Sequence, residues 1–253
     1  MWLENSMKIS KPLLITKLKA TAVHLSMSVA VFIYLAYQIY YNWYPEPYFS
    51  VDGGWAGIRL VGAVDLVLGP LITFLIFDLG KSRRAILFDL ITIAVIQLSA
   101  LSYGVYSTYT QRPVAVVVID QFVYSATMEQ YAGTLTSTSE LQRYSDEKPP
   151  IIYSDFPLDR EGIDEVQRIT IEDKVLEIAQ MHLYRPRAEL LAALQKHQSA
   201  AEELLDKDGR QALADWLQEN GKTMNEVLIL HFSGRYDNAW LIFDLEGRLA
   251  GYF

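Results

Sequence analysis

Three apolar stretches in the first part of this chain constrain its fold more than any other feature of the sequence. They are residues 20–41, 58–77 and 86–108. Each is about 20 residues long, which is the length at which an α-helix crosses a hydrocarbon core about 30 Å thick. Aromatic residues, not a small-residue cleavage site, follow the first stretch, which favours a retained anchor over a signal peptide. We predict three transmembrane helices in a membrane domain of residues 20–109.

Basic residues set the predicted orientation, because cytoplasmic loops carry an excess of Lys and Arg. They precede the first stretch or lie between the second and third: Lys8, Lys11, Lys17, Lys19, Lys81, Arg83 and Arg84. The loop between the first two stretches has neither Lys nor Arg. It is rich in Tyr and Trp, which are enriched at membrane–water interfaces, and we place these residues at the non-cytoplasmic interface. We expect residues 1–19 to be cytoplasmic and residues 110–253 to be exported, which in a bacterial inner membrane means periplasmic.

The two parts of the chain differ in charge. Residues 1–108 have a net charge of +2 and residues 109–253 a net charge of −10. The acidic part is long enough to bury one core of its own, and its charge argues against a nucleic-acid partner. The chain has no Cys, so an exported domain would not depend on disulfides, which is compatible with a periplasm.

The exported part is predicted to be α+β. Strands are expected at residues 114–119, 151–153, 227–232, 239–243 and 249–253, the last three forming a meander. The first of these is an unbroken apolar run, which is typical of a strand buried on both faces. Helices are expected at residues 163–184, from Pro186 onward, and from an N-terminal cap at Asp208 to Asn220. A surface loop is expected at residues 133–150.

Small and polar residues share faces of the second and third apolar helices. The candidate partner-binding residues are Gly62, Asp65, Gly69, Pro70, Gln97, Ala100 and Gly104. Gly62, Asp65 and Gly69 are spaced i, i+3 and i+7, so they lie on one helical face. Small residues let a neighbouring helix approach closely, and a polar group can then bond across the contact. Two interpretations stay open: these faces pack the three helices together, or they bind a helix of another protein.

Asp65 is the most informative of these residues, because a charged group at the bilayer centre costs roughly 3 kcal/mol or more. No Lys or Arg lies at a matching depth in the other two stretches. Hydroxyl groups, Gln97 and His24 are its candidate internal partners, and Arg59 lies about two turns away. An intermolecular or a catalytic role is the alternative.

Catalytic motifs are absent from the sequence. The four His residues lack metal-ligand spacing, and no nucleophile elbow or glycine-rich phosphate loop is present. An intramembrane aspartyl peptidase would need two carboxylates that share a proton; Asp65 and Asp89 are the candidates, but their depths differ. We expect no enzymatic activity, no metal, no cofactor and no small-molecule substrate. A membrane-anchored sensor or interaction protein is a further alternative.

Six short segments in the first 120 residues form a specific combination. They are KISKPLLITKLKA (8–20), WYPEPY (43–48), VDLVLGPL (64–71), KSRR (81–84), QLSALSYG (97–104) and RPV (112–114). Together they resemble the type IV pilin accessory proteins of the TfpX/TfpZ type. The resemblance implies a chaperone-like inner-membrane protein of a Gram-negative bacterium that stabilises one cognate major pilin and promotes its assembly into pili. The implied partners are that pilin and membrane lipid.

Overall fold

The computed structural model describes residues 11–78, 80–131 and 133–253. The first ten residues of the predicted cytoplasmic segment lie outside the described residues. Two compact units are present. The first contains the described residues up to Asn42 together with Trp55–Tyr109, and the second contains Trp43–Gly54 and Thr110–Phe253.

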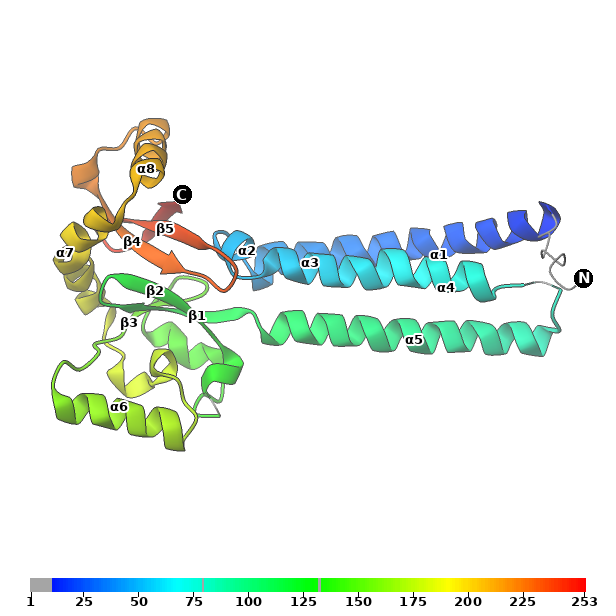
Figure 1. Ribbon diagram of the computed structural model, residues 1–253, viewed down its shortest axis with the longest axis horizontal. Coiled ribbons are helices and arrows are strands. Elements are labelled where there is room, and N and C mark those ends of the chain that lie inside the picture. Colours follow the sequence, from blue (N-terminus) through cyan, green and yellow to red (C-terminus); the bar gives the residue numbers. More distant parts are fainter. Residues whose placement is uncertain (1–10, 79, 132) are drawn as a thin grey trace, which may run out of the picture. The chain divides into compact units, whose positions relative to one another are not determined.

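The first unit consists of three helical runs that lie side by side (Figure 1). They are α1 (Lys11–Tyr37) with the π-helical η1 (Gln38–Trp43); α3 (Gly54–Gly62), the π-helical η2 (Ala63–Leu68) and α4 (Gly69–Ile76); and α5 (Arg83–Thr110). Among the described residues, these three runs are long and apolar enough to cross a membrane, by length and composition. The three predicted apolar helices are therefore present, within a few residues of most expected ends.

The second helical run changes register at η2, where Asp65 lies. The Gly69 N–H donates to the Val64 carbonyl, which is the i→i−5 bond of a π turn. Pro70 follows directly and has no N–H with which to form the α-helical bond to Leu66. The π turn at η2 therefore lies directly before Pro70, the residue that interrupts the α-helical hydrogen bonds. α1 packs along both α4 and η2.

A six-stranded sheet forms the centre of the second unit, in the order β3-β1-β2-β4-β5-β6. The strands are β1 (Pro113–Ile119), β2 (Phe122–Thr127), β3 (Ile151–Tyr153), β4 (Val227–Ser233), β5 (Asn238–Asp244) and β6 (Leu249–Tyr252). The β1–β3 and β2–β4 pairs are parallel and the others antiparallel. The five predicted strands are confirmed. β2 was not predicted; it follows β1 after a turn in which Asp120 has φ 51°.

Hydrophobic clusters on both faces explain why β1 is apolar throughout. Val116 and Val118 belong to a cluster with Leu194 and Phe232. Val117 belongs to a second cluster, which also contains side chains of the 3-10 helices η3 (Met128–Tyr131), η4 (Thr138–Arg143) and η5 (Glu177–Ala179). The prediction of a strand buried on both faces is confirmed.

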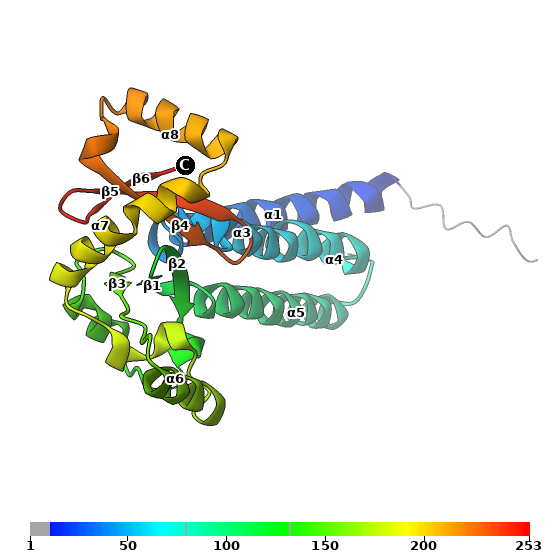
Figure 2. The same cartoon turned by 60° about the vertical axis from the view of Figure 1, so that its left-hand side comes forward.

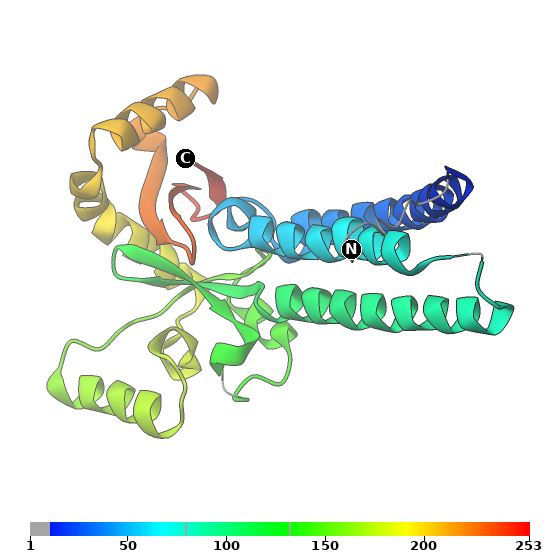
Figure 3. The ribbon, with the colours of Figure 1, turned by 45° about the vertical axis from the view of Figure 1, so that its right-hand side comes forward.

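Three α-helices flank this sheet: α6 (Arg160–Glu172), α7 (Arg187–Leu204) and α8 (Lys207–Glu219). α7 packs against β3 and β4 (Figure 2), and α6 lies toward the β3 end of the sheet and α8 toward the β6 end (Figure 3). Two expectations were wrong. The helix predicted at 163–184 ends at Glu172, shortly before Lys174 with φ 61°, and the 3-10 helices η5 and η6 (Met181–Leu183) follow. Asp206, not Asp208, caps α8, because its Oδ1 accepts from the Gly209 N–H at 2.7 Å.

The loop between the first two apolar helices is part of the second unit. It contains the short helix α2 (Tyr48–Val51) (Figure 1). Tyr48 is 2% exposed, and its ring contacts Phe232 edge-on at a centroid distance of 5.6 Å. The Val51 carbonyl accepts from the Tyr236 N–H at 3.0 Å, and Asp52 Oδ1 accepts from the Arg235 N–H at 3.1 Å. We call residues 47–52 the strap.

Candidate functional site

Asp65 lies at the centre of a buried polar cluster that joins three helical segments. Its side chain is on η2 and is 4% exposed. Oδ1 accepts from Ser28 Oγ of α1 at 3.0 Å and from Gln97 Nε2 of α5 at 2.9 Å. Gln97 Nε2 also lies 3.3 Å from the Val64 carbonyl. We call Ser28, Asp65 and Gln97 the polar cluster.

The other carboxyl oxygen of Asp65 is not satisfied in the same way. Oδ2 is buried and has no hydrogen-bond partner among the described residues. Leaving a buried acceptor without a donor costs about 1–3 kcal/mol. The polar cluster therefore keeps an unused acceptor in the middle of the apolar helices, which is the position where a polar group is most often functional.

A second polar contact joins α1 to α4. His24 Nδ1 lies 2.6 Å from Thr73 Oγ1, and the Thr73 side chain is buried. Of the internal partners proposed for Asp65, a hydroxyl and Gln97 are therefore found, whereas His24 bonds to Thr73. Ser28 was not among the residues predicted from the sequence. Its signal was weak but present: it lies four residues after His24, so both polar residues share one face of α1.

The glycines among the candidate residues lie at contacts between helices of this unit. A Cβ at Gly69 would lie 2.5 Å from Gln97 Oε1, one at Gly62 would lie 3.1 Å from Phe32, and one at Gly104 would lie 3.6 Å from Leu60. Ala100 is half-buried and Pro70 is buried. The tight contacts give Gly69 and Gly62 a packing role within the chain, whereas a Cβ at Gly104 would make an ordinary contact. Partner binding by these residues stays a prediction.

A pocket of about 840 Å³ lies between α1, α4 and α5. Its wall is mainly apolar and includes Val23, Met27, Ile93 and Leu98. The polar groups on it belong to His24, Thr73 and Gln97, with Thr16 and Lys19 of α1 also on its lining. We call this pocket the helical groove. Of the seven candidate residues, Gln97 is the one that lines it, and its amide links the groove to Asp65.

The two carboxylates considered for an aspartyl peptidase, Asp65 and Asp89, have different partners. Asp89 forms an ion pair with Lys81 at 2.6 Å, whereas Asp65 bonds to Ser28 and Gln97. Within the described ranges of the chain, no three His, Asp or Glu side chains are grouped so that they could hold a metal ion.

The fold and the polar cluster define a class of protein: three bilayer-length apolar helices linked by a buried carboxylate, together with an α+β unit. Residues 12–53 match the family described as Fimbrial assembly protein FimB. The chain is 38% identical over 99 residues to the fimbrial assembly protein of serogroups C1 and C2 from Dichelobacter nodosus, a match that covers 39% of this chain and 76% of that protein. The chain belongs to this family of fimbrial assembly proteins.

Two longer relatives show how far the similarity extends. The fimbrial assembly proteins of serogroups E1 and I from Dichelobacter nodosus are also 38% identical over 99 residues. The match spans 38% of the length of each and 39% of this chain. No solved structure matches the chain.

Proposed function

We propose that this protein is a non-catalytic accessory protein of the TfpX/TfpZ type, which stabilises a type IV major pilin in the bacterial inner membrane and promotes its assembly into pili. Membership in the fimbrial assembly family supports a role in pilus assembly. The chaperone-like action is our inference from the resemblance of the first 120 residues and from the helical groove.

The proposed topology follows from the charge pattern. Lys11, Lys17 and Lys19 precede or begin the first apolar helix, and the loop that contains Lys81 joins the second to the third. By the positive-inside rule, these segments are cytoplasmic. The α+β unit is then periplasmic. With this orientation the helical groove lies in the cytoplasmic half of the bilayer, because it is formed by the first half of α1, the end of α4 and the first part of α5.

The helical groove is the observation that carries the proposal. A pilin that waits in the membrane on one apolar helix presents an apolar surface with a polar N-terminal end. Apolar residues of the groove, such as Met27 and Leu98, would pack against the apolar surface of the pilin helix. The polar groups of His24 and Gln97 would bond to its polar N-terminal end. Lipid tails are as apolar as these side chains, so close packing and hydrogen bonds must supply the specificity.

Site-specific photo-crosslinking in cells that produce the major pilin tests the groove. A photoreactive residue is placed at Met27 or Leu98, which line the groove. Matched controls are Leu25 and Ile96, which are exposed on the same helices but do not belong to its lining. We expect adducts to pilin at the first pair and not at the second. Equal adducts at all four positions, or none, would contradict binding in the groove.

Asp65 provides a second test. In Asp65→Leu the protein should still reach the membrane but pilin levels and piliation should fall, if the carboxylate also serves the partner. Ser28→Ala is the control, because it removes one internal donor and leaves the carboxylate in place. Immunoblots of both proteins and counts of surface pili are the measurements. Normal piliation in Asp65→Leu would show that this residue serves only the internal packing.

A further inference from the structure

A pocket of about 540 Å³ lies in the α+β unit, beside the C-terminal half of α6. Ile169 and Met181 form part of its apolar wall, and its polar groups come from Thr134, Asp173, Gln180 and His182. This volume is in the usual range of ligand sites.

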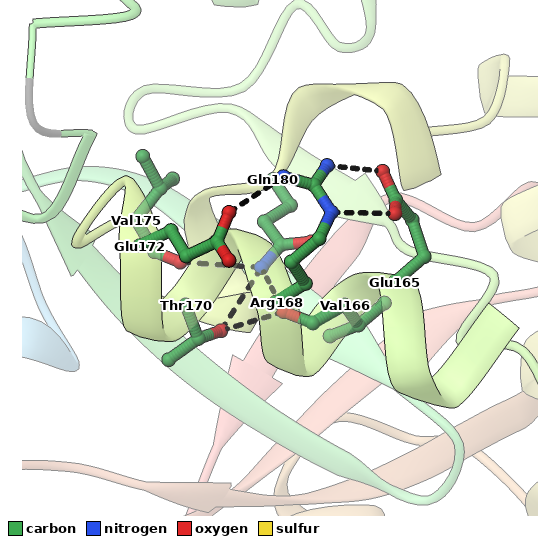
Figure 4. Close-up of polar contacts among 7 residues, drawn as sticks. All are labelled: Glu165, Val166, Arg168, Thr170, Glu172, Val175 and Gln180. Atoms are coloured by element: carbon green, nitrogen blue, oxygen red, sulfur yellow. Dashed lines mark hydrogen bonds and ion pairs between the residues drawn. The ribbon is translucent and has the colours of Figure 1, made fainter.

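The amide of Gln180 has a fixed orientation. Its side chain is 2% exposed, and Nε2 lies 3.0 Å from the Val166 carbonyl, 3.0 Å from Thr170 Oγ1 and 3.2 Å from the Val175 carbonyl (Figure 4). Because carbonyl oxygens can only accept, the NH₂ group must point toward them. The opposite atom, Oε1, is buried and has no hydrogen-bond partner among the described residues.

Two further polar groups on the lining, those of Thr134 and Asp173, add acceptors, whereas the ring of the fourth, His182, can donate as well as accept. The Thr134 hydroxyl donates to the Tyr131 carbonyl at 2.6 Å, so its own free capacity is that of an acceptor. The Asp173 carboxylate is exposed and forms no ion pair with any residue in the described parts of the chain. The unused acceptors of Thr134, Asp173 and Gln180 beside an apolar wall favour a ligand that donates hydrogen bonds, carries positive charge and has an apolar stem.

We propose that this pocket binds the side chain of a Lys or Arg residue of another exported protein. The cationic end donates to Asp173, Thr134 and Gln180 Oε1, and the methylene stem packs on Ile169 and Met181. Oε1 is covered in this conformation; Met181 is half-buried, and its three rotatable bonds allow it to make room for the donor. The net charge of −10 in residues 109–253 favours the approach of a basic partner. The proposal rests on the export of this unit, not on the identity of pilin as the partner.

A titration of the full chain in detergent micelles tests the pocket directly. The probe is N-acetyl-arginine amide, and the readout is the NMR shift of the Met181 methyl group, assigned with Met181→Leu. We expect a saturable shift that weakens at high salt, and a much smaller response to N-acetyl-citrulline amide, which has nearly the same shape without the charge. No saturable shift, or equal affinity for both probes, would overturn the proposal.

Two variants separate the pocket from the general charge of α6. Asp173→Asn should lower the affinity for the arginine probe about tenfold, which corresponds to about 1.4 kcal/mol. Asp164→Asn removes an exposed carboxylate from the same helix outside the lining, and should leave the affinity unchanged. Equal loss in both variants would mean that the probe senses only the net charge of the surface. Because pilin is absent from the assay, its result is independent of the proposed function.

Discussion

At the scale of single residues, the polar cluster specifies how the three apolar helices fit together. Apolar surfaces of helix and lipid are interchangeable, so hydrophobic burial does not select one arrangement of helices in a bilayer. A buried acceptor that must meet donors from two other helices does select one. Asp65 Oδ1 accepts from α1 and from α5, and any slip along either helix would break a bond.

Gly69 makes this arrangement possible because it leaves room for the Gln97 side chain. In Gly69→Ala the new Cβ would lie 2.5 Å from Gln97 Oε1. The Gln97 side chain is flexible, but moving its amide would break the bond to Asp65 Oδ1. A buried polar group left without its partner costs about 1–3 kcal/mol, so we expect a lower melting temperature in detergent micelles. Gly104→Ala is the matched control: its Cβ would lie 3.6 Å from Leu60, an ordinary contact. Equal melting temperatures for the two variants would argue against tight packing at Gly69.

Asp52 in the strap should make stability depend on pH. Burial raises the pKa of this carboxyl above its usual range, although the Ser125 hydroxyl and the Arg235 N–H act in the opposite direction. The folded state therefore disfavours the charged form, and the stability that the neutral carboxyl contributes is lost as pH rises from about 4 through the folded pKa. Asp52→Asn keeps the size and cannot ionise.

The difference in melting temperature between Asp52→Asn and the wild-type chain measures this effect. We expect it to be close to zero near pH 4 and to favour the Asn variant at pH 7.5. Differential measurement cancels the titration of the other carboxylates. A difference that stays constant across this range would show that Asp52 does not carry the predicted linkage.

At the scale of elements, the strap adds a segment from between two apolar helices to the core of the α+β unit. Tyr48→Ala removes a fully buried aromatic side chain, which costs about 3–5 kcal/mol at such sites. We expect the α+β unit of the full chain to become sensitive to a protease added in solution. Tyr41→Ala is the control, because Tyr41 is 61% exposed. Similar resistance in both variants would mean that the strap is dispensable for this unit.

Elements with strong local patterns were predictable from the sequence. The apolar helices, β1 and the meander follow directly from length, apolar runs and turn residues. The helix expected at 163–184 failed because apolar spacing continues beyond Glu172, while the left-handed Lys174 ends the α-helix. The strap could not be predicted, since Tyr48 contacts Phe232 and the Val51 carbonyl bonds to the Tyr236 N–H, and both partners are far along the chain.

The candidate site was predictable only where the pattern within a single helix was sufficient. Spacing along one helix was enough to single out Asp65, Gly69 and Gln97, which do lie together. Ser28 shares one face of α1 with His24, but its bond to Asp65 and the helical groove depend on how α1 meets the other helices, and no pattern within one helix contains that information. A contact between two helices depends on both of them. A single sequence therefore indicates such a contact only where a polar or small residue interrupts an otherwise apolar helix.

At the scale of the whole molecule, charge is distributed so that it can direct insertion. The first 108 residues have a net charge of +2 and the rest a net charge of −10. Basic residues lie at the N-terminal end of α1 and before α5, and the loop between the first two apolar helices has none. Orientation depends on Lys and Arg in short loops near the membrane, and much less on acidic residues.

The absence of Cys from the sequence makes this orientation directly measurable. Single cysteines are introduced as Ser82→Cys, in the basic loop before α5, and Ser139→Cys, in η4 of the α+β unit; both residues are exposed. Cells with a permeabilised outer membrane are treated with a maleimide that does not cross the inner membrane. Ser139→Cys should be labelled in intact spheroplasts and Ser82→Cys only after lysis, because the positive-inside rule retains the basic loop in the cytoplasm. Labelling of Ser82→Cys in intact spheroplasts and of Ser139→Cys only after lysis would show the opposite topology. The α+β unit would then meet its partners on the cytoplasmic side of the membrane.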